Sequence, residues 1–177
     1  MNTVLVGFKR SPFTIANKGL LSKIRPEDIL SQVINDLVRT TNIIKDDIED
    51  IIAGCAYPEG AQGYNIAKIV SFMTDMPEHV GGMTINRWCG SSMQVIHSAA
   101  GAIAMNAGKV FICCGIESMT SVPINGLNYT PHPDLLIDQP NVYLSMGLTA
   151  ENVAKKYNLS RKEQQDFAIK SHFNASK

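Results

Sequence analysis

One cysteine in this sequence stands where a thiol can be made reactive. Cys89 lies in the stretch 86–92, which reads Asn-Arg-Trp-Cys-Gly-Ser-Ser, between an expected strand and an expected helix. A thiol at a helix N-terminus faces unpaired backbone N–H groups and the positive end of the helix dipole, and both favour the nucleophilic thiolate. Gly90 lets the backbone turn tightly and lets a substrate approach. Cys89 is therefore the candidate nucleophile for covalent catalysis, although most single cysteines are inert core residues.

The remaining cysteines and histidines are weaker candidates. Cys113 and Cys114 lie within an apolar strand-like run and Cys55 ends another, so all three are expected to pack in the core. No cysteine pair has Cys-x-x-Cys spacing and no histidine stands at zinc-ligand spacing from a cysteine, so no metal site is expected. His97 is expected to be a hydrogen-bonded histidine inside a buried helix.

The charge balance excludes several classes of function. Lysine and arginine total 16, aspartate and glutamate also total 16, and this neutrality gives no case for binding nucleic acid or a membrane surface. No apolar run is long enough to span a membrane. Lys9 and Arg10 follow the short apolar N-terminus instead of preceding it, so no signal peptide is expected. The sequence predicts a reduced, cytoplasmic compartment, with the mitochondrial matrix as the open alternative.

Strands and helices alternate around Cys89. Strands are expected at 3–8, 50–56, 82–86 and 110–116, and helices at 65–72, from Cys89 to about 106 and after Pro26. The apolar stripe of the helix after Pro26 is expected to consist of Ile29, Val33, Leu37 and Val38. This alternation predicts an α/β fold in which helices cover a sheet. The helix after Cys89 is small and apolar on all sides and is expected to be buried, and strand 110–116 is expected to be buried on both faces.

The pattern changes after residue 119. Four prolines between residues 120 and 145 predict an irregular excursion. A helix is expected at 147–157, and the Ser-Arg-Lys-Glu sequence at 160–163 is a capping box that begins a last helix.

Four stretches resemble motifs of the thiolase family, in the family's order. Residues 86–92 with the small-residue helix resemble its acyl-enzyme cysteine motif, and residues 115–119, Gly-Ile-Glu-Ser-Met, resemble its next signature. Residues 146–154, Met-Gly-Leu-Thr-Ala-Glu-Asn-Val-Ala, resemble its loop-domain signature, and residues 10–13, Arg-Ser-Pro-Phe, resemble an Arg-Thr-Pro-Phe near thiolase N-termini. The sequence is identified as the N-terminal portion of a member of this family.

The resemblance implies both a fold and an activity. Residues 1–118 would be a thiolase-like N-terminal α/β half-domain, a mixed sheet sandwiched by helices, and residues 119–177 the first part of the loop domain. The activity would be acyl transfer between coenzyme A thioesters, either thiolytic cleavage of a 3-ketoacyl-CoA or condensation to acetoacetyl-CoA. Cys89 would carry the acyl group, and the backbone of Cys89 and Gly90 would contribute to an oxyanion hole. Coenzyme A would be a substrate with no further cofactor, and the protein would be a homo-oligomer, either a dimer or a tetramer.

The resemblance also suggests roles for residues around the nucleophile. Met146 would lie near the acyl pocket, with plain packing as the alternative. Trp88 would either wall the pocket or pack at a subunit interface. Glu117 is expected to tie strand ends together rather than to do acid/base work.

Part of the family's catalytic machinery is not expected in this chain. Thiolases take an activating histidine from a Gly-His-Pro motif and a second, acid/base cysteine from a Cys-x-Gly motif, both in the C-terminal half. The isolated chain is therefore expected to lack thiolysis activity. Two alternatives stay open: an inactive fragment that at most dimerises or binds coenzyme A weakly, and a ketoacyl-synthase-like condensing enzyme.

Overall fold

The protein consists of two compact units. The computed structural model describes residues 3–177, and the chain divides into unit 1, Met1–Tyr129, and unit 2, Thr130–Lys177. The domain boundary expected between residues 118 and 119 marks the start of the family's loop domain. It is a different boundary from the division into compact units, and it stays a prediction.

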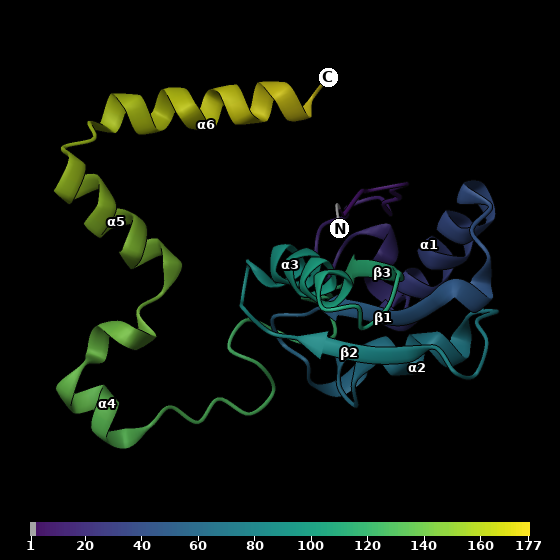
Figure 1. Cartoon of the computed structure of the whole chain (residues 1–177). Helices are drawn as coiled ribbons and strands as arrows, with labels where there is room; N and C mark the ends of the chain where they lie inside the picture. The colour runs from purple at the N-terminus through teal and green to yellow at the C-terminus, as the bar shows by residue number, and fades with distance from the viewer. Residues whose placement is uncertain (1–2) are drawn as a thin grey trace. The chain divides into compact units, whose positions relative to one another are not determined.

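A three-stranded parallel sheet forms the centre of unit 1. Strands β1 (Ile48–Gly54), β2 (Gly81–Ile85) and β3 (Val110–Gly115) lie in the order β2-β1-β3, as Figure 1 shows. Gly54 pairs with both Ile85 and Gly115, so the carboxyl ends of all three strands meet at one edge. The expected α/β class is confirmed. The expected sheet was mixed, whereas the strands within residues 3–177 all pair in parallel.

Helices α1 (Pro26–Thr41) and α2 (Ile66–Met73) cover one face of this sheet, and α3 (Ser91–Ala104) covers the other. Successive side chains of a strand point to opposite faces, so β1 feeds both layers. Ile51 and Ala53 pack with α1 and α2, while Ile52 packs with Val95 and Ala99 of α3. Parallel strands buried on two faces are typical of α/β proteins.

Helix α1 begins where the sequence predicts. Pro26 stands in its first turn with Glu27 and Asp28, where a missing N–H is tolerated and acidic groups suit the helix dipole. The buried stripe differs from the expected one. Leu30, Ile34 and Val38 are buried, whereas three of the four expected positions are only half-buried: Ile29, Val33 and Leu37.

Three other expectations about unit 1 are wrong. Residues 3–8 form no strand, because none of the three described strands pairs with them, and Val4 and Phe8 are 74% and 83% exposed. Helix α3 is buried only along the side that meets the sheet, and Met93, Ile96 and His97 are exposed. Strand β3 is an edge strand within the described sheet, so most of its side chains are half-buried.

Unit 2 is helical. Its helices are α4 (Pro133–Asp138), α5 (Met146–Tyr157) and α6 (Arg161–Ala175). The expected capping box is confirmed, since the Ser160 N–H donates to Glu163 Oε2 at 2.8 Å and the Glu163 N–H donates to Ser160 Oγ at 3.3 Å. Short 3-10 turns complete the chain at Leu20–Lys23, Lys45–Asp47, Gly60–Gln62 and Pro140–Tyr143. No helix within residues 3–177 has the length and apolar character that crossing a membrane requires.

Candidate active site

Cys89 lies at the N-terminal end of α3, in the loop that leaves β2. Its side chain is exposed, and Gly90 is the N-cap residue of the helix that begins at Ser91. The N–H groups of Gly90 and Ser91 donate to the carbonyl oxygens of Arg87 and Trp88, each at 3.0 Å. Cys89 itself forms an isolated bridge with Arg87, and its N–H immediately precedes these two turn donors in the chain. A backbone donor beside an exposed thiol is the arrangement that an oxyanion site needs.

Two glycines let α3 approach the sheet closely beneath this cysteine. A Cβ atom on Gly54, the last residue of β1, would lie 2.6 Å from the Ser92 backbone nitrogen and 2.7 Å from the Ser91 carbonyl carbon. A Cβ atom on Gly115, the last residue of β3, would lie 2.1 Å from Ser92 Oγ. The start of α3 therefore rests directly on the carboxyl ends of two strands, the edge where α/β proteins commonly bind ligands.

Two polar side chains hold the loop that carries Cys89. The Ser91 hydroxyl, on a residue that is only 4% exposed, donates to the Trp88 carbonyl at 2.6 Å and accepts from the Arg87 N–H at 2.8 Å. Asn86 Oδ1 accepts from the Trp88 N–H at 2.9 Å, and Asn86 Nδ2 donates to the Ala56 carbonyl at 3.0 Å. These bonds keep Trp88 at a φ of 48°, a left-handed conformation that is unfavourable for an aromatic residue.

The Trp88 ring lies beside Tyr57. The two rings meet edge to face with centroids 5.2 Å apart, a favourable geometry for aromatic pairs. Trp88 remains 60% exposed. The expected site residues Trp88, Cys89 and Gly90 lie together because they are consecutive residues of the loop between β2 and α3. Met146 is the first residue of α5 in unit 2 and is 72% exposed, and its place near an acyl pocket stays a prediction.

The other three cysteines lie in less reactive surroundings. Burial, with Glu117 as a second cause, raises the pKa of the Cys55 thiol to about 12. Burial raises the pKa of Cys114 to about 12 and also raises the pKa of Cys113. Cys113 packs toward α3 and Cys114 toward α1 and α2. All three pack in or against the core as expected, and Cys89 is the one exposed thiol among the described residues.

One Cys-x-Gly triplet does occur in this chain, and one histidine lies in different surroundings from those expected. Cys113-Cys114-Gly115 has the letters of a Cys-x-Gly motif, but Cys113 lies within β3 and its thiol is directed at the Val95 carbonyl of α3, 4.0 Å away. Its thiol therefore lies in the packing between β3 and α3, whereas Cys89 is exposed. His97 is exposed on α3 rather than buried, because the helix presents only one side to the sheet.

Glu117 joins the ends of β1 and β3, as expected. Its Oε2 accepts from the Ala56 N–H at 2.7 Å, and its Oε1 accepts from Gln62 Nε2 at 2.9 Å. Gln62 is fully buried, and its amide oxygen accepts from the Ser118 N–H. The same Nε2 group also donates to the Tyr57 carbonyl at 2.8 Å. Gln62 is a site-supporting residue that sequence reasoning missed.

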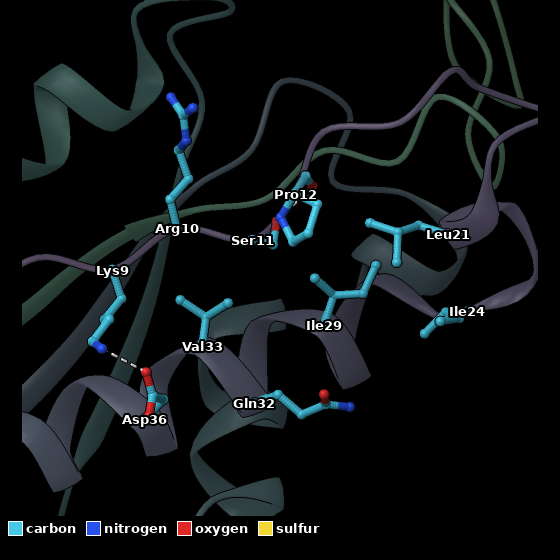
Figure 2. A pocket seen from close by; sticks show the side chains of 10 residues that line it. All are labelled: Lys9, Arg10, Ser11, Pro12, Leu21, Ile24, Ile29, Gln32, Val33 and Asp36. Carbon is cyan, nitrogen blue, oxygen red and sulfur yellow. Dashed lines mark hydrogen bonds and ion pairs between the residues drawn. The ribbon is translucent and has the colours of Figure 1, made fainter.

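A separate hollow lies between the N-terminal segment and α1. Figure 2 shows Ser11 and Pro12 above Ile29 and Val33, with Lys9 paired to Asp36 at 2.8 Å. Its lining residues do not include Cys89 or its neighbours in the loop. The Arg-Ser-Pro-Phe stretch thus lies against α1, and Arg10 lies over the Phe13 ring.

Comparison with known proteins agrees with this geometry. The model of the family described as thiolase, N-terminal domain, matches residues 3–177. The chain belongs to the thiolase family. Among the curated relatives of this thiolase chain, a 3-ketoacyl-CoA thiolase from Bacillus subtilis (strain 168) is 40% identical over 174 residues, which are 98% of this chain and 44% of the relative. A 3-ketoacyl-CoA thiolase from Aeromonas salmonicida (strain A449) is 36% identical over a match that covers 97% of this chain and 44% of the relative's length.

A solved structure shares the fold of this thiolase chain. It is a crystal structure of a thiolase from Ascaris suum in complex with coenzyme A, with a TM-score of 0.75 and 27% sequence identity, and the match covers 91% of this chain and 44% of that one. The chain thus spans less than half the length of the relatives it matches.

Proposed function

We propose that Cys89 is the acyl-accepting nucleophile of a thiolase reaction, acyl transfer between coenzyme A thioesters. The observation that carries this proposal is the setting of the thiol. Cys89 is exposed immediately before the N-cap of α3, while burial raises the pKa of the other three thiols. A helix N-terminus favours the thiolate. Membership of the thiolase family, and relatives named 3-ketoacyl-CoA thiolase, support the substrate class.

The proposed chemistry proceeds through a covalent intermediate. In the thiolytic direction the Cys89 thiolate attacks the ketone carbon of a 3-ketoacyl-CoA, and a C–S bond forms. The bond between the ketone carbon and the adjacent methylene carbon then breaks, and the departing carbanion takes a proton and leaves as acetyl-CoA. The shortened acyl group remains on Cys89 as a thioester. The thiol of a second coenzyme A takes over the acyl group and restores the free cysteine.

The backbone of the loop supports the charged intermediates in this proposal. The Cys89 N–H, beside the exposed thiol, supplies one donor for the oxyanion, and the helix start behind Gly90 adds its dipole. Trp88, which precedes the nucleophile, is proposed to line the acyl pocket. Coenzyme A enters as a substrate, and the Ascaris suum thiolase, whose structure is a complex with coenzyme A, supports this assignment.

Complete turnover is proposed to require catalytic groups from the part of the related thiolases that this chain does not match. The sequence contains no Gly-His-Pro, and its one Cys-x-Gly triplet packs into the core. Acyl transfer from acetyl-CoA to Cys89, however, needs only a thiolate, because coenzyme A leaves as a thiolate in its turn. The isolated chain is therefore expected to accept one acyl group and then to stop.

Release of free coenzyme A from acetyl-CoA tests this proposal. The wild-type chain is expected to release about one equivalent per chain, as quantified by liquid chromatography after removal of the protein. Cys89→Ser is expected to release none. Cys113→Ser is the matched control, since it removes a thiol from the same unit, and it is expected to behave like wild type. Equal release by Cys89→Ser and wild type would refute the proposed role of Cys89.

A further inference from the structure

A chain of hydrogen bonds runs from Glu117 to the residue before the nucleophile. Glu117 Oε2 accepts from the Ala56 N–H at 2.7 Å. The carbonyl of the same Ala56 accepts from Asn86 Nδ2 at 3.0 Å. Asn86 Oδ1 in turn accepts from the Trp88 N–H at 2.9 Å. The Glu117 carboxylate is thus linked through Ala56 and Asn86 to the backbone of Trp88, the residue before Cys89.

A second connection leads from Glu117 to the side chain of Trp88. Glu117 Oε1 accepts from Gln62 Nε2, and the same Nε2 donates to the Tyr57 carbonyl. Tyr57 packs edge to face against Trp88. Gln62 has no exposed surface, so its amide has no access to water as a substitute partner. Both the backbone and the ring of Trp88 therefore depend on where Glu117 holds residues 56–62.

We propose that Glu117 is a positioning residue for Cys89, acting through Ala56 and Asn86 on the strained backbone of Trp88. The inference rests on the proposed role of Cys89 as nucleophile. Glu117 makes no contact with that thiol; instead its carboxylate accepts hydrogen bonds from the Cys55 thiol, the Ala56 N–H and Gln62 Nε2, which fix the loop between β1 and α2. Asn86 bonds to both that loop and Trp88, whose φ of 48° needs outside support.

Replacing the Glu117 carboxylate would leave a hydrogen-bond donor without an acceptor. In Glu117→Gln the side chain keeps its shape but has one acceptor oxygen and one amide group. Either the Ala56 N–H or the Gln62 amide then faces an NH₂ group and loses its bond. The 56–62 loop is expected to shift, and Trp88 is expected to relax toward an ordinary φ. Cys89 would then lose its alignment with the start of α3.

The chain carries its own reporter of this loop, because Trp88 is its single tryptophan. Fluorescence and near-ultraviolet circular dichroism therefore report the setting of Trp88 without labelling. The rate of alkylation of Cys89 by iodoacetamide, followed by peptide mass spectrometry across pH, reports the thiolate. Both readouts apply to the full 177-residue chain and need no turnover.

The test compares two variants that break the hydrogen-bond chain from Glu117 to Trp88 with two control variants. Glu117→Gln and Asn86→Ala are each expected to shift the Trp88 emission and to slow alkylation of Cys89 at neutral pH about fivefold. Glu151→Gln removes a charge from an exposed position in α5 and is expected to change neither readout. Val38→Ala truncates the core on the far face of the sheet and is expected to lower the melting temperature while leaving both readouts unchanged.

Two results would overturn the inference. One is wild-type emission and alkylation, within about twofold, in both Glu117→Gln and Asn86→Ala. The other is an equal change in Val38→Ala, which would show that general destabilisation is the cause. Failure of the proposed function looks different. In that case Cys89 of the wild-type chain would still react with iodoacetamide, and its alkylation would still slow in Glu117→Gln and Asn86→Ala. The wild-type chain would, however, take no acetyl group from acetyl-CoA.

Discussion

Replacing Gly54 with alanine perturbs the contact that places Cys89 most directly. The new Cβ atom would lie 2.6 Å from the Ser92 nitrogen, 2.7 Å from the Ser91 carbonyl carbon and 2.9 Å from the Ser92 Cα. All three atoms belong to the backbone, so no side-chain rotation relieves the overlap. Ordinary contacts lie at about 3.5–4.0 Å, and the start of α3 must therefore move by about 1 Å.

This displacement has two measurable consequences. Overpacking of a close helix-sheet contact costs about 1–3 kcal/mol, which lowers the melting temperature by about 3–10 °C for a unit of this size. A nucleophile displaced by about 1 Å loses up to about 100-fold in rate. Thermal unfolding followed by circular dichroism measures the first effect, and the rate of acetylation of Cys89 by acetyl-CoA measures the second.

Gly101→Ala is the matched control. Gly101 is exposed in α3, and its Cβ would meet no atom of the described residues within 4 Å. Alanine is a better helix former than glycine by about 1 kcal/mol, so this variant is expected to be slightly more stable with unchanged Cys89 reactivity. A Gly54→Ala protein that melts and reacts like Gly101→Ala would refute the packing argument.

Gly115→Ala separates backbone overlap from side-chain overlap. Its Cβ would lie 2.1 Å from Ser92 Oγ and 3.3 Å from Ser92 Cβ. Removing the hydroxyl with Ser92→Ala takes away the shorter of these contacts. The double variant Gly115→Ala, Ser92→Ala is therefore expected to recover most of the lost stability, whereas adding Ser92→Ala to Gly54→Ala is expected to recover none. Equal recovery in the two double variants would contradict this account.

Further predictions concern thiol reactivity, pH, helix capping and turnover. During brief iodoacetamide labelling at neutral pH, Cys89 is expected to be alkylated before Cys55, Cys113 and Cys114, and peptide mass spectrometry that finds it last would exclude it as the reactive thiol. The pKa values of Cys55 and Cys114 are raised from 9.0 to about 12 by burial, so between these values the unfolded chain releases protons that the folded chain retains. The free energy of unfolding is therefore expected to be unaffected by these thiols below about pH 9 and to fall as the pH rises toward 12. Urea titrations at pH 8 and pH 10 measure this fall. If the double variant Cys55→Ala, Cys114→Ala loses as much free energy of unfolding as the wild type, other groups cause the loss. Ser160→Ala removes the acceptor for the Glu163 N–H and is expected to reduce helical ellipticity at the start of α6. Ser171→Ala, at an exposed position within α6, serves as the control and should not lower it. The isolated chain is expected to show no sustained cleavage of acetoacetyl-CoA with coenzyme A, and repeated turnover by the purified protein would show that it needs no further groups.

The sequence predicts best those features that local chemistry decides. Pro26 with its acidic neighbours marks the start of α1, and Ser160 with Glu163 marks the start of α6, because each signal acts within one helical turn. Alternating strands and helices predict the α/β class for the same reason. Cys89 is placed at a helix N-terminus by its position between β2 and α3 and by the family motif around it.

The features that depend on distant partners were predicted poorly. Residues 3–8 have the composition of a strand, but a strand forms only where another pairs with it. Helix α3 has apolar residues on all sides, yet the sheet covers only one of them. The support of the Cys89 loop by Gly54 and Gln62 joins residues far apart in the chain, and neither residue stands in a recognisable motif.

Peptide mass spectrometry after incubation with acetyl-CoA tests the central claim most directly. The account predicts a hydroxylamine-sensitive gain of one acetyl group on the peptide that contains Cys89, and unmodified peptides for Cys55, Cys113 and Cys114. An acetyl thioester on one of those three, or none on a Cys89 that still reacts with iodoacetamide, would contradict it.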